Sequence, residues 1–316
     1  MTGVNKLDRQ IPADIASELV CYLLQNVSLF FCDLWRNIAS SFDSDGFTLE
    51  EDSSSLGLNE SSHNMVSWNW KGGGSASANS DGSTASSVSV NTTAGVSIVG
   101  YTGAGATTYG HGLGATPNVI IIKKRTSDSG NNNWFVYHDK VITAGGSNKS
   151  FLTLNETGAT TANGSATTFT SVSSTTFGVG TDDIISESSH TFIAYCFAEK
   201  KGYSKFGKYV GNNANDGAYV FTGFKPAFII IKRTDSADDW KMVSREVEVH
   251  NPMNQSVKAN SSVAEATESD HAMDLLSNGF KFRENNAAFN AAGTYVYMAW
   301  AQEPFVTSEG LPTTAL

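Results

Sequence analysis

The chain has 316 residues and a mass of 33.7 kDa, long enough for two or three domains whose cores need no disulfides. Its 40% of hydrophobic residues excludes a disordered chain, and its formal charge of −10 argues against a nucleic-acid-binding protein, which needs clustered Lys and Arg. Only 16% of residues are charged and about 68 are Ser or Thr. Short apolar stretches between Gly, Ser, Thr and Asn clusters are typical of all-β proteins with many strands.

The N-terminal segment is the one place where the pattern predicts a helix. Pro12 and Asp14 mark its start, and the apolar residues that follow are spaced by threes and fours up to residue 38. Polar residues interrupt this stretch too often for a membrane span, and it lacks the layout of a signal peptide. The wide apolar stripe must be buried, either on the rest of the chain or as an anchor or oligomerisation element. The stripe consists of Leu19, Leu23, Val27, Phe30 and Leu34.

An internal repeat is the strongest signal in the sequence. The run from Pro117 to Lys123 returns as Pro226 to Lys232 at an offset of 109 residues. The apolar run 192–197 returns as 295–300 at an offset of 103. These offsets predict two copies of one module of roughly 105 residues. The two copies are expected to have the same strand order.

A third, partial copy precedes the two full ones. Residues 42–49 resemble the segment around Phe280, and residues 65–70 resemble the closing strand of each full module. The first half of this copy is missing, so its open edge should be covered by residues 12–38 or by another subunit.

Within each module the pattern predicts strands alone. Residues 97–101 and 119–123 are rich in β-branched residues, residues 133–138 should form a hairpin with the second of these runs, and residues 192–197 should form a central strand. The Gly- and Ser-rich run 72–91 is interpreted as a flexible linker or long loop. The predicted fold class is all-β, with tandem β-sandwich (jelly-roll-like) modules and a short N-terminal α-helix.

Five segments follow from these patterns. They are an N-terminal helical segment (1–41), a partial β module with a Gly/Ser-rich linker (42–91), a first full β-sandwich module (92–202), a second β-sandwich module (203–305) and a C-terminal tail (306–316).

No catalytic or metal-binding pattern stands out, so we expect no enzyme activity and no cofactor. The six histidines lack metal-ligand spacing, and His111 is interpreted as part of a turn before a strand. Cys21, Cys32 and Cys196 form no disulfide framework, and Cys196 should be a small buried hydrophobic residue. The Asp43-Ser-Asp-Gly46 run has the oxygen-rich composition of a Ca²⁺ loop but is better explained as a turn.

Aromatic residues give the candidate recognition surface. Trp134 and Trp240 recur at equivalent module positions, which favours a core role. Four tyrosines near predicted loops are the candidate surface-recognition residues, because exposed aromatic rings are suited to stacking on sugars. These are Tyr101, Tyr109, Tyr203 and Tyr209.

Several of these segments together resemble a known family. The residues that carry the resemblance are the run 42–49, His111-Gly-Leu-Gly through Lys123, Tyr195 through Gly207, and Tyr219 through Phe228. They resemble a module common in virion proteins of marine and aquatic tailed bacteriophages, over roughly residues 42–305. A weaker similarity is to concanavalin-like jelly rolls. Residues 1–41 depart from the family pattern.

The resemblance implies a non-enzymatic virion structural protein, assembled in the host bacterial cytoplasm. A tail-fibre or other surface-exposed component involved in host recognition is the favoured role. The expected partners are other copies of the chain, with a trimer favoured, other virion proteins and a host surface glycan, but neither nucleic acid nor a membrane. The alternatives are a carbohydrate-binding adhesin module of a bacterial surface or extracellular protein, and a glycan-degrading depolymerase, which would need a pair of carboxylates in a cleft.

Overall fold

The computed structural model describes residues 39–43, 46–49, 69–70, 72–126, 132–145, 150–162, 168–261, 263, 265–267 and 271–302. In these ranges the regular structure is almost entirely antiparallel β-sheet, with a short helix α2 (Asp183–Ser186). The all-β prediction is therefore confirmed. The helix predicted within residues 12–38 lies outside the described residues.

The first half of the described chain contains a large sheet and a small sheet. The strands are β3 (Ser77–Asn79), β4 (Ser86–Asn91), β5 (Val96–Thr102), β6 (Thr107–Gly110), β7 (Val119–Lys124), β8 (Trp134–His138), β9 (Ser150–Thr153), β10 (Thr161–Ala162), β11 (Phe169–Val172), β12 (Thr176–Val179) and β13 (Thr191–Phe197). The large sheet has eight strands in the order β10-β9-β8-β7-β13-β5-β4-β3, and the small sheet has the order β11-β12-β6. The predicted central strand at residues 192–197 is confirmed, because β13 lies between β7 and β5.

The second half repeats this arrangement. Its strands are β14 (Ser204–Val210), β15 (Tyr219–Phe221), β16 (Pro226–Arg233), β17 (Lys241–Ser244), β18 (Gln255–Lys258), β19 (Ala266–Thr267), β20 (Met273–Leu276), β21 (Gly279–Phe282) and β22 (Thr294–Ala301). The order β19-β18-β17-β16-β22-β14 matches β10 through β5, and β20-β21-β15 matches β11-β12-β6. The register agrees as well, since Ile121 pairs with Tyr195 where Ile230 pairs with Met298. The expected identity of strand order in the two copies is confirmed.

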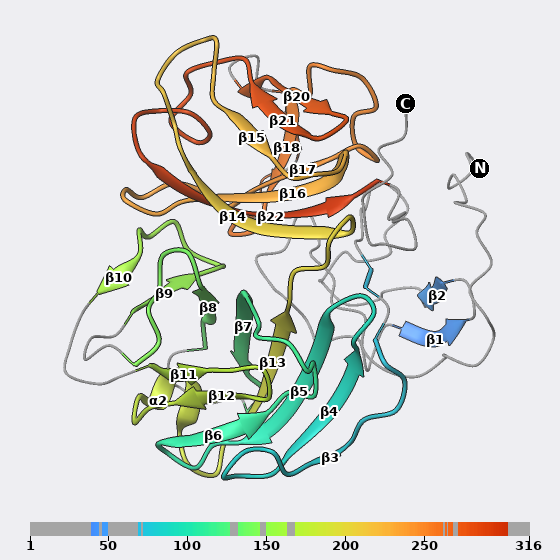
Figure 1. Ribbon diagram of the computed structural model, residues 1–316, viewed down its shortest axis with the longest axis vertical. Coiled ribbons are helices and arrows are strands. Elements are labelled where there is room, and N and C mark those ends of the chain that lie inside the picture. The colour runs from blue at the N-terminus through green and yellow to red at the C-terminus, as the bar shows by residue number, and fades with distance from the viewer. Residues whose placement is uncertain are drawn as a thin grey trace.

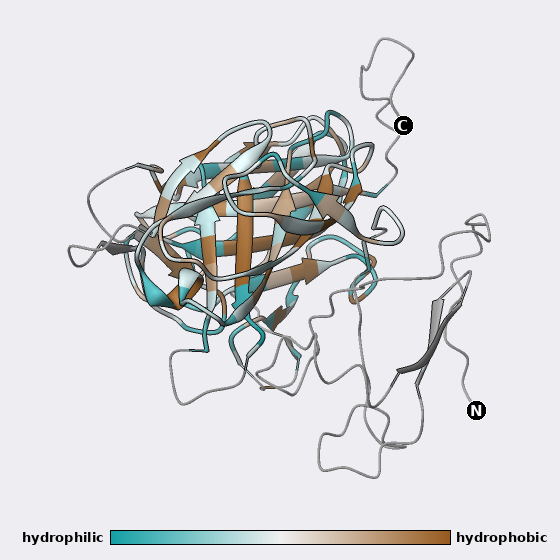
Figure 2. Ribbon diagram, turned by 90° about the horizontal axis from the view of Figure 1, so that it is seen from below, coloured by the Kyte–Doolittle hydropathy of each residue, from teal (hydrophilic) through white to brown (hydrophobic). Residues whose placement is uncertain are grey.

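The two large sheets pack on each other, so the halves are fused rather than strung along the chain. Figure 1 shows the second half above the first, with β14 and β22 facing the lower half. Alternation along the strands makes this possible: Val119 and Ile121 face the second half, whereas Ile120 and Ile122 face the small sheet of their own half. Figure 2 shows the hydrophobic residues concentrated in these strands. The buried residues between the halves, called the interface core below, include Ile121, Val136, Tyr195, Ile230, Met298 and Trp300.

Two side chains of the second half, Trp240 and Lys232, form hydrogen bonds to the backbone of the first half. The indole Nε1 of Trp240 donates to the carbonyl oxygen of Thr153 at 2.8 Å. The Nζ of Lys232 donates to the carbonyl oxygens of Thr157 (3.0 Å) and Asp238 (2.9 Å). Each of these groups is thereby satisfied although it is removed from water.

The linker expected over residues 72–91 is wrong. Residues 77–79 and 86–91 form β3 and β4, which extend the large sheet beyond β5. Val88 and Val90 stand two residues apart and contact the core of the first half, and Val88 is buried. The remaining residues of β4 are Ser and Asn, so the composition concealed a period-two apolar pattern.

A hairpin matches the partial copy near the N-terminus. β1 (Ala39–Asp43) and β2 (Gly46–Leu49) are antiparallel, with Asp43 opposite Gly46. The β20–β21 hairpin has the same register, with Leu276 opposite Gly279. Residues 44 and 45, where the turn is predicted, lie outside the described residues.

Aromatic residues at one equivalent position of all three copies meet in the interface core. The ring centroid of Trp70 lies 6.0 Å from that of Phe197 and 5.0 Å from that of Trp300. Phe197 and Trp300 are themselves 6.0 Å apart. Trp70 therefore joins the described part of the partial copy to both full copies.

Candidate functional site

The candidate site is a groove of about 400 Å³ at one side of the second half. It lies between the chain that leads into β14, the end of β15 and the turn between β20 and β21. It is therefore built from turns and strand ends, where side chains are held by the sheets but need not fill a core. Its lining residues are Glu199, Lys201, Gly202, Ser204, Lys205, Phe221, Thr222, Gly223 and Asn278.

The corresponding part of the first half is closed by the chain itself. There β4 pairs with the outer edge of β5, and residues 79–84 run along β6. The amide N–H of Thr84 donates to the carbonyl oxygen of Thr108 at 3.1 Å. In the second half, no strand of the described chain pairs with the outer edge of β14 or β15. The groove exists because the second copy lacks a counterpart of the β3–β4 hairpin.

Two aromatic side chains occupy the uncovered strand β15. Tyr219 is 46% exposed and Phe221 is 61% exposed, whereas Val220 between them is buried. The register places Phe221 at the position that Gly110 holds in β6. A Cβ at Gly110 would lie 1.6 Å from the Oδ1 of Asn79, so the covered copy has no room for a side chain there.

Hydrogen bonds hold the polar end of the groove. The hydroxyl of Tyr219 donates to the Oδ1 of Asn278 at 2.8 Å. The amide N–H groups of Thr222 and Gly223 donate to the carbonyl oxygen of Asn278 at 3.0 and 3.1 Å. Gly223 has a φ of +84°, a conformation that favours glycine, and it lies beside the ring of Phe221. The turn is thus fixed relative to the aromatic strand.

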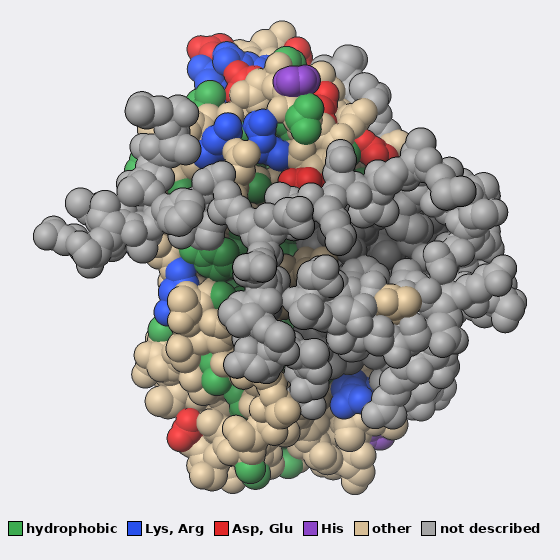
Figure 3. Space-filling model, turned by 90° about the vertical axis from the view of Figure 1, so that its right-hand side faces the viewer, with side chains coloured by type: hydrophobic (Ala, Val, Ile, Leu, Met, Phe, Trp, Pro, Cys, Tyr) green, Lys and Arg blue, Asp and Glu red, His purple; other side chains and the backbone are tan. Residues whose placement is uncertain are grey.

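The charged side of the groove carries two lysines and one carboxylate. The Nζ of Lys205 donates to the Oε1 of Glu199 at 2.6 Å, and Lys201 is exposed. On the face that Figure 3 presents, Lys and Arg side chains lie among Asp and Glu side chains on the upper part of the molecule, where the second half lies. The lining residues therefore offer an aromatic ring, several hydrogen-bond donors and positive charge.

The tyrosines predicted as a recognition surface do not form one. Tyr101 and Tyr109 are buried in the core of the first half, and Tyr209 is buried in the core of the second. Their hydroxyls donate to the carbonyl oxygens of Ile185, Thr102 and Phe289, respectively. Burial raises the pKa of all three phenols. Tyr203 is half-buried against the interface core.

The surface prediction failed because nearness to a loop does not determine which face of a strand a side chain occupies. Tyr101 lies on the buried face of β5, where its ring stacks on that of Phe192 with centroids 5.2 Å apart. The residues that were missed, Tyr219 and Phe221, do carry a signal. Two aromatics at alternate positions of a short strand place both rings on the same face.

Other sequence interpretations fit the structure. Trp134 and Trp240 are buried, as their recurrence indicates. Cys196 is buried in β13, and burial raises the pKa of its thiol. His111 is buried before the strand β7, where its Nδ1 accepts a hydrogen bond from the amide N–H of Leu113 at 3.2 Å.

Neither a metal-binding cluster nor a membrane-spanning helix occurs in the described ranges. They contain no cluster of three or more His, Cys, Asp or Glu side chains that could hold a metal ion. They also contain no helix with the length and apolarity needed to cross a membrane.

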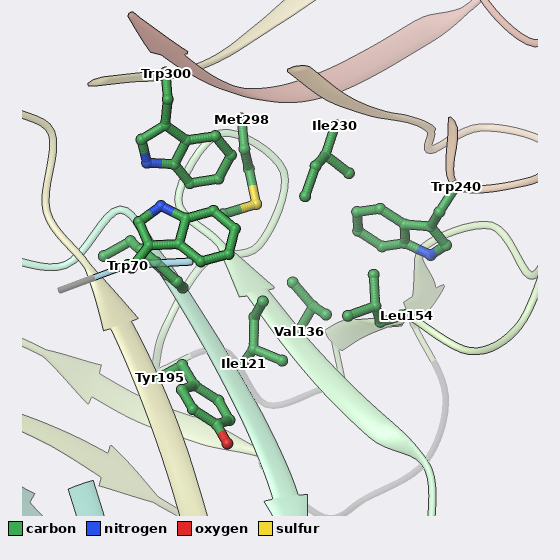
Figure 4. Close-up of a pocket in the computed structure, with 10 residues that line it drawn as sticks. Trp70, Ile121, Val136, Leu154, Tyr195, Ile230, Trp240, Met298 and Trp300 are labelled. Carbon is green, nitrogen blue, oxygen red and sulfur yellow. The ribbon is translucent and has the colours of Figure 1, made fainter. Parts of the chain in front are cut away.

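A small enclosed cavity lies inside the interface core. Its volume is about 30 Å³, and every lining residue is aliphatic or aromatic or is a methionine. Figure 4 shows Ile121, Val136 and Leu154 from the first half opposite Ile230, Trp240 and Met298 from the second. A void of this size and polarity is a packing defect between two sheets. It does not have the polar groups that orient a ligand.

Comparison with profiles of protein families identifies the family of this chain. The profile of a family described as a domain of unknown function, DUF7483, matches residues 33–304. The chain belongs to the DUF7483 family. No curated protein and no solved structure matches this DUF7483 chain. Its family therefore supplies no residue roles, and the groove must be interpreted from its own chemistry.

Proposed function

We propose that this DUF7483 protein is a structural protein of a tailed-bacteriophage virion. It stands on the particle surface, as a tail-fibre or similar component, and takes part in host recognition by binding a surface glycan in the groove. The observation that carries the glycan-binding role is the exposed aromatic side chain of Phe221 beside polar groups in an uncovered groove. The virion assignment rests on the sequence resemblance over residues 42–305.

The chemistry of the groove suits a saccharide. A pyranose ring has one face of C–H groups, which packs on an aromatic ring, and a rim of hydroxyls, which need hydrogen-bond partners. Phe221 provides the ring, while the exposed side chains of Asn278 and Lys201 provide polar groups. The proposed role is binding without cleavage. Among the described lining residues Glu199 is the one carboxylate, whereas glycoside hydrolysis uses two.

The groove is tested by a glycan array probed with the full chain and with Phe221→Ala. We expect the wild type to retain a set of bacterial surface glycans and the variant to lose them. A matched control is Val249→Ala, which removes an exposed hydrophobic side chain that does not line the groove. Bound oligosaccharides should be recovered intact by mass spectrometry. Cleaved products would contradict the non-enzymatic role, and an array with no bound glycan would contradict glycan recognition.

The place of the protein is tested on purified particles. Immunogold labelling with an antibody to this chain should mark the tail or another exposed part of the virion. The alternative, a carbohydrate-binding adhesin module of a bacterial surface or extracellular protein, predicts label on bacterial cells that carry no phage. The trimer expected from the resemblance is tested by light scattering of the full chain. The jelly-roll-like module and the helix within residues 12–38 remain predictions.

A further inference from the structure

We infer that the saccharide bound in the groove carries a carboxylate, so the ligand class is an acidic glycan. This inference rests on the proposed glycan-binding function and narrows it. It follows from three properties of the groove: an unbalanced positive charge, hydrogen-bond donors that remain available to a ligand, and an exposed aromatic side chain on a different element.

The positive charge of the groove is not neutralised by its own residues. Glu199 is engaged with Lys205 through a contact of 2.6 Å, and its second oxygen faces the amide N–H of Phe206 at 3.5 Å. Lys201 lines the same groove, is exposed, and forms no ion pair with a described residue. One positive charge therefore remains in the groove of a chain whose formal net charge is −10.

The polar groups of the groove that keep hydrogen-bonding capacity for a ligand are donors, because the acceptors Glu199 and Asn278 Oδ1 are already engaged. Because the Tyr219 hydroxyl donates to the Oδ1 of Asn278, the amide of Asn278 is oriented with its NH₂ group free to donate. The ammonium groups of Lys201 and Lys205 are donors alone. A carboxylate only accepts hydrogen bonds, and bonds between charged partners are stronger than those between neutral ones.

The aromatic wall and the cationic wall come from different elements. Phe221 belongs to β15, whereas Lys201 and Lys205 belong to the chain that enters β14. A sugar acid has an apolar ring face and an anionic group on the ring. It can therefore pack on Phe221 while its carboxylate meets Lys201. A neutral sugar would offer Lys201 only hydroxyl groups, which bind an ammonium less strongly than a carboxylate does.

The inference is tested by titrating the full chain with trigalacturonate and with its methyl ester. A panel of acidic bacterial oligosaccharides, each with a carboxyl-reduced twin, extends the same comparison. Binding is measured by calorimetry at low and at physiological salt. We expect the acidic member of each bound pair to bind at least about fivefold more tightly, with the preference reduced at the higher salt concentration.

Two variants locate the effect. Lys201→Gln should reduce the preference for the acidic member by roughly fivefold. Lys208→Gln is the control, because Lys208 is an exposed lysine of β14 that does not line the groove, and it should leave the preference unchanged.

Three other outcomes would each contradict one of the proposals. If the neutral twins bind as tightly as the acids, the acidic class is wrong while glycan recognition stands. If no saccharide on the array or in the panel binds, the proposed function itself fails. If an acidic peptide such as hexaglutamate binds more tightly than trigalacturonate, and Phe221→Ala still binds it, the groove is a polypeptide site and the saccharide inference is overturned.

Discussion

Single positions in the second half show which side chains hold the fold and which are available for binding. Phe221 is 61% exposed on β15, whereas Phe280 on the neighbouring strand β21 is completely buried in the second-half core. Both are phenylalanines of one small sheet, and they differ only in the face that they occupy. Removal of the two rings should therefore affect stability to very different extents.

Phe221→Ala should change the free energy of unfolding by less than about 0.5 kcal/mol, because little of the ring leaves water on folding. Phe280→Ala should lower it by roughly 3–5 kcal/mol, since it leaves a cavity in a packed core. Urea denaturation of both variants measures the difference. A large loss of stability in Phe221→Ala would show that the ring is a structural element and would weaken its assignment to the groove.

His138 is a buried histidine whose charge should affect stability in acid. Its Nδ1 accepts from the amide N–H of Lys140 at 3.3 Å, and its Nε2 lies 3.4 Å from the carbonyl oxygen of Tyr297 in the other half. Burial lowers the pKa of its imidazole from 6.5 to about 4, although Asp139 opposes this shift. The folded protein therefore holds the ring neutral.

Stability should fall as the pH falls from 6.5 to about 4, because in this window the unfolded chain binds a proton at His138 that the folded chain does not. His138→Gln should flatten this part of the stability curve, measured by thermal unfolding at a series of pH values. His250→Gln, which alters an exposed histidine of the second half, is the control. An unchanged slope in His138→Gln would mean that another group is responsible.

The cavity in the interface core offers a test of packing between the halves. Val136→Ile adds one methylene group at the wall of a void of about 30 Å³. It should raise the free energy of unfolding by up to about 0.8 kcal/mol. Val243→Ile, in the buried core of the second half, is the matched control and should be neutral or destabilising. A loss of stability in Val136→Ile would show that the cavity walls cannot accept the added group.

At the scale of elements, equivalent strands differ according to their neighbours. β5 is paired on both sides and carries no charged residue, whereas β14 is an edge strand of the described sheet and carries Lys205 and Lys208. Charged residues on an edge strand oppose pairing with the edge of another molecule. The same strand position is therefore an interior strand in the first half and a charged edge strand in the second.

Lys208→Val should increase self-association of the chain, because it removes a charge from the open edge of β14 and adds a β-branched residue. Dynamic light scattering over a concentration series measures the effect. Lys140→Val, in a loop of the first half, is the control and should not associate. If both variants remained unchanged, the edge of β14 would have to be protected by some other feature.

The elements also show what the sequence could predict. That the two halves share one strand order was accessible, because the repeat is preserved in apolar runs such as 119–123 and 192–197. β3 and β4 were not, because their small polar residues resemble a linker and only Val88 and Val90 mark the buried face. The groove was not predictable from any local pattern, since it depends on which edge of which copy lacks a partner.

The whole molecule should unfold as one unit, because the interface core contains side chains from both large sheets. Separating the halves would expose this apolar surface to water on both sides. Differential scanning calorimetry of the full chain should give a single transition with equal calorimetric and van't Hoff enthalpies. Two resolved transitions would show that each half is stable without the other.

The missing hairpin of the second copy has a consequence for how this protein can change over evolutionary time. Most residues around the groove lie on turns and strand ends, while the interface core and the two sandwich cores hold the fold. If the groove binds a glycan as proposed, substitutions at positions such as Lys201, Phe221 and Asn278 would alter what is bound without disturbing the sheets. A lineage that carries this chain could then shift its binding specificity by point mutation, while the first copy, closed by its own hairpin, keeps the scaffold constant.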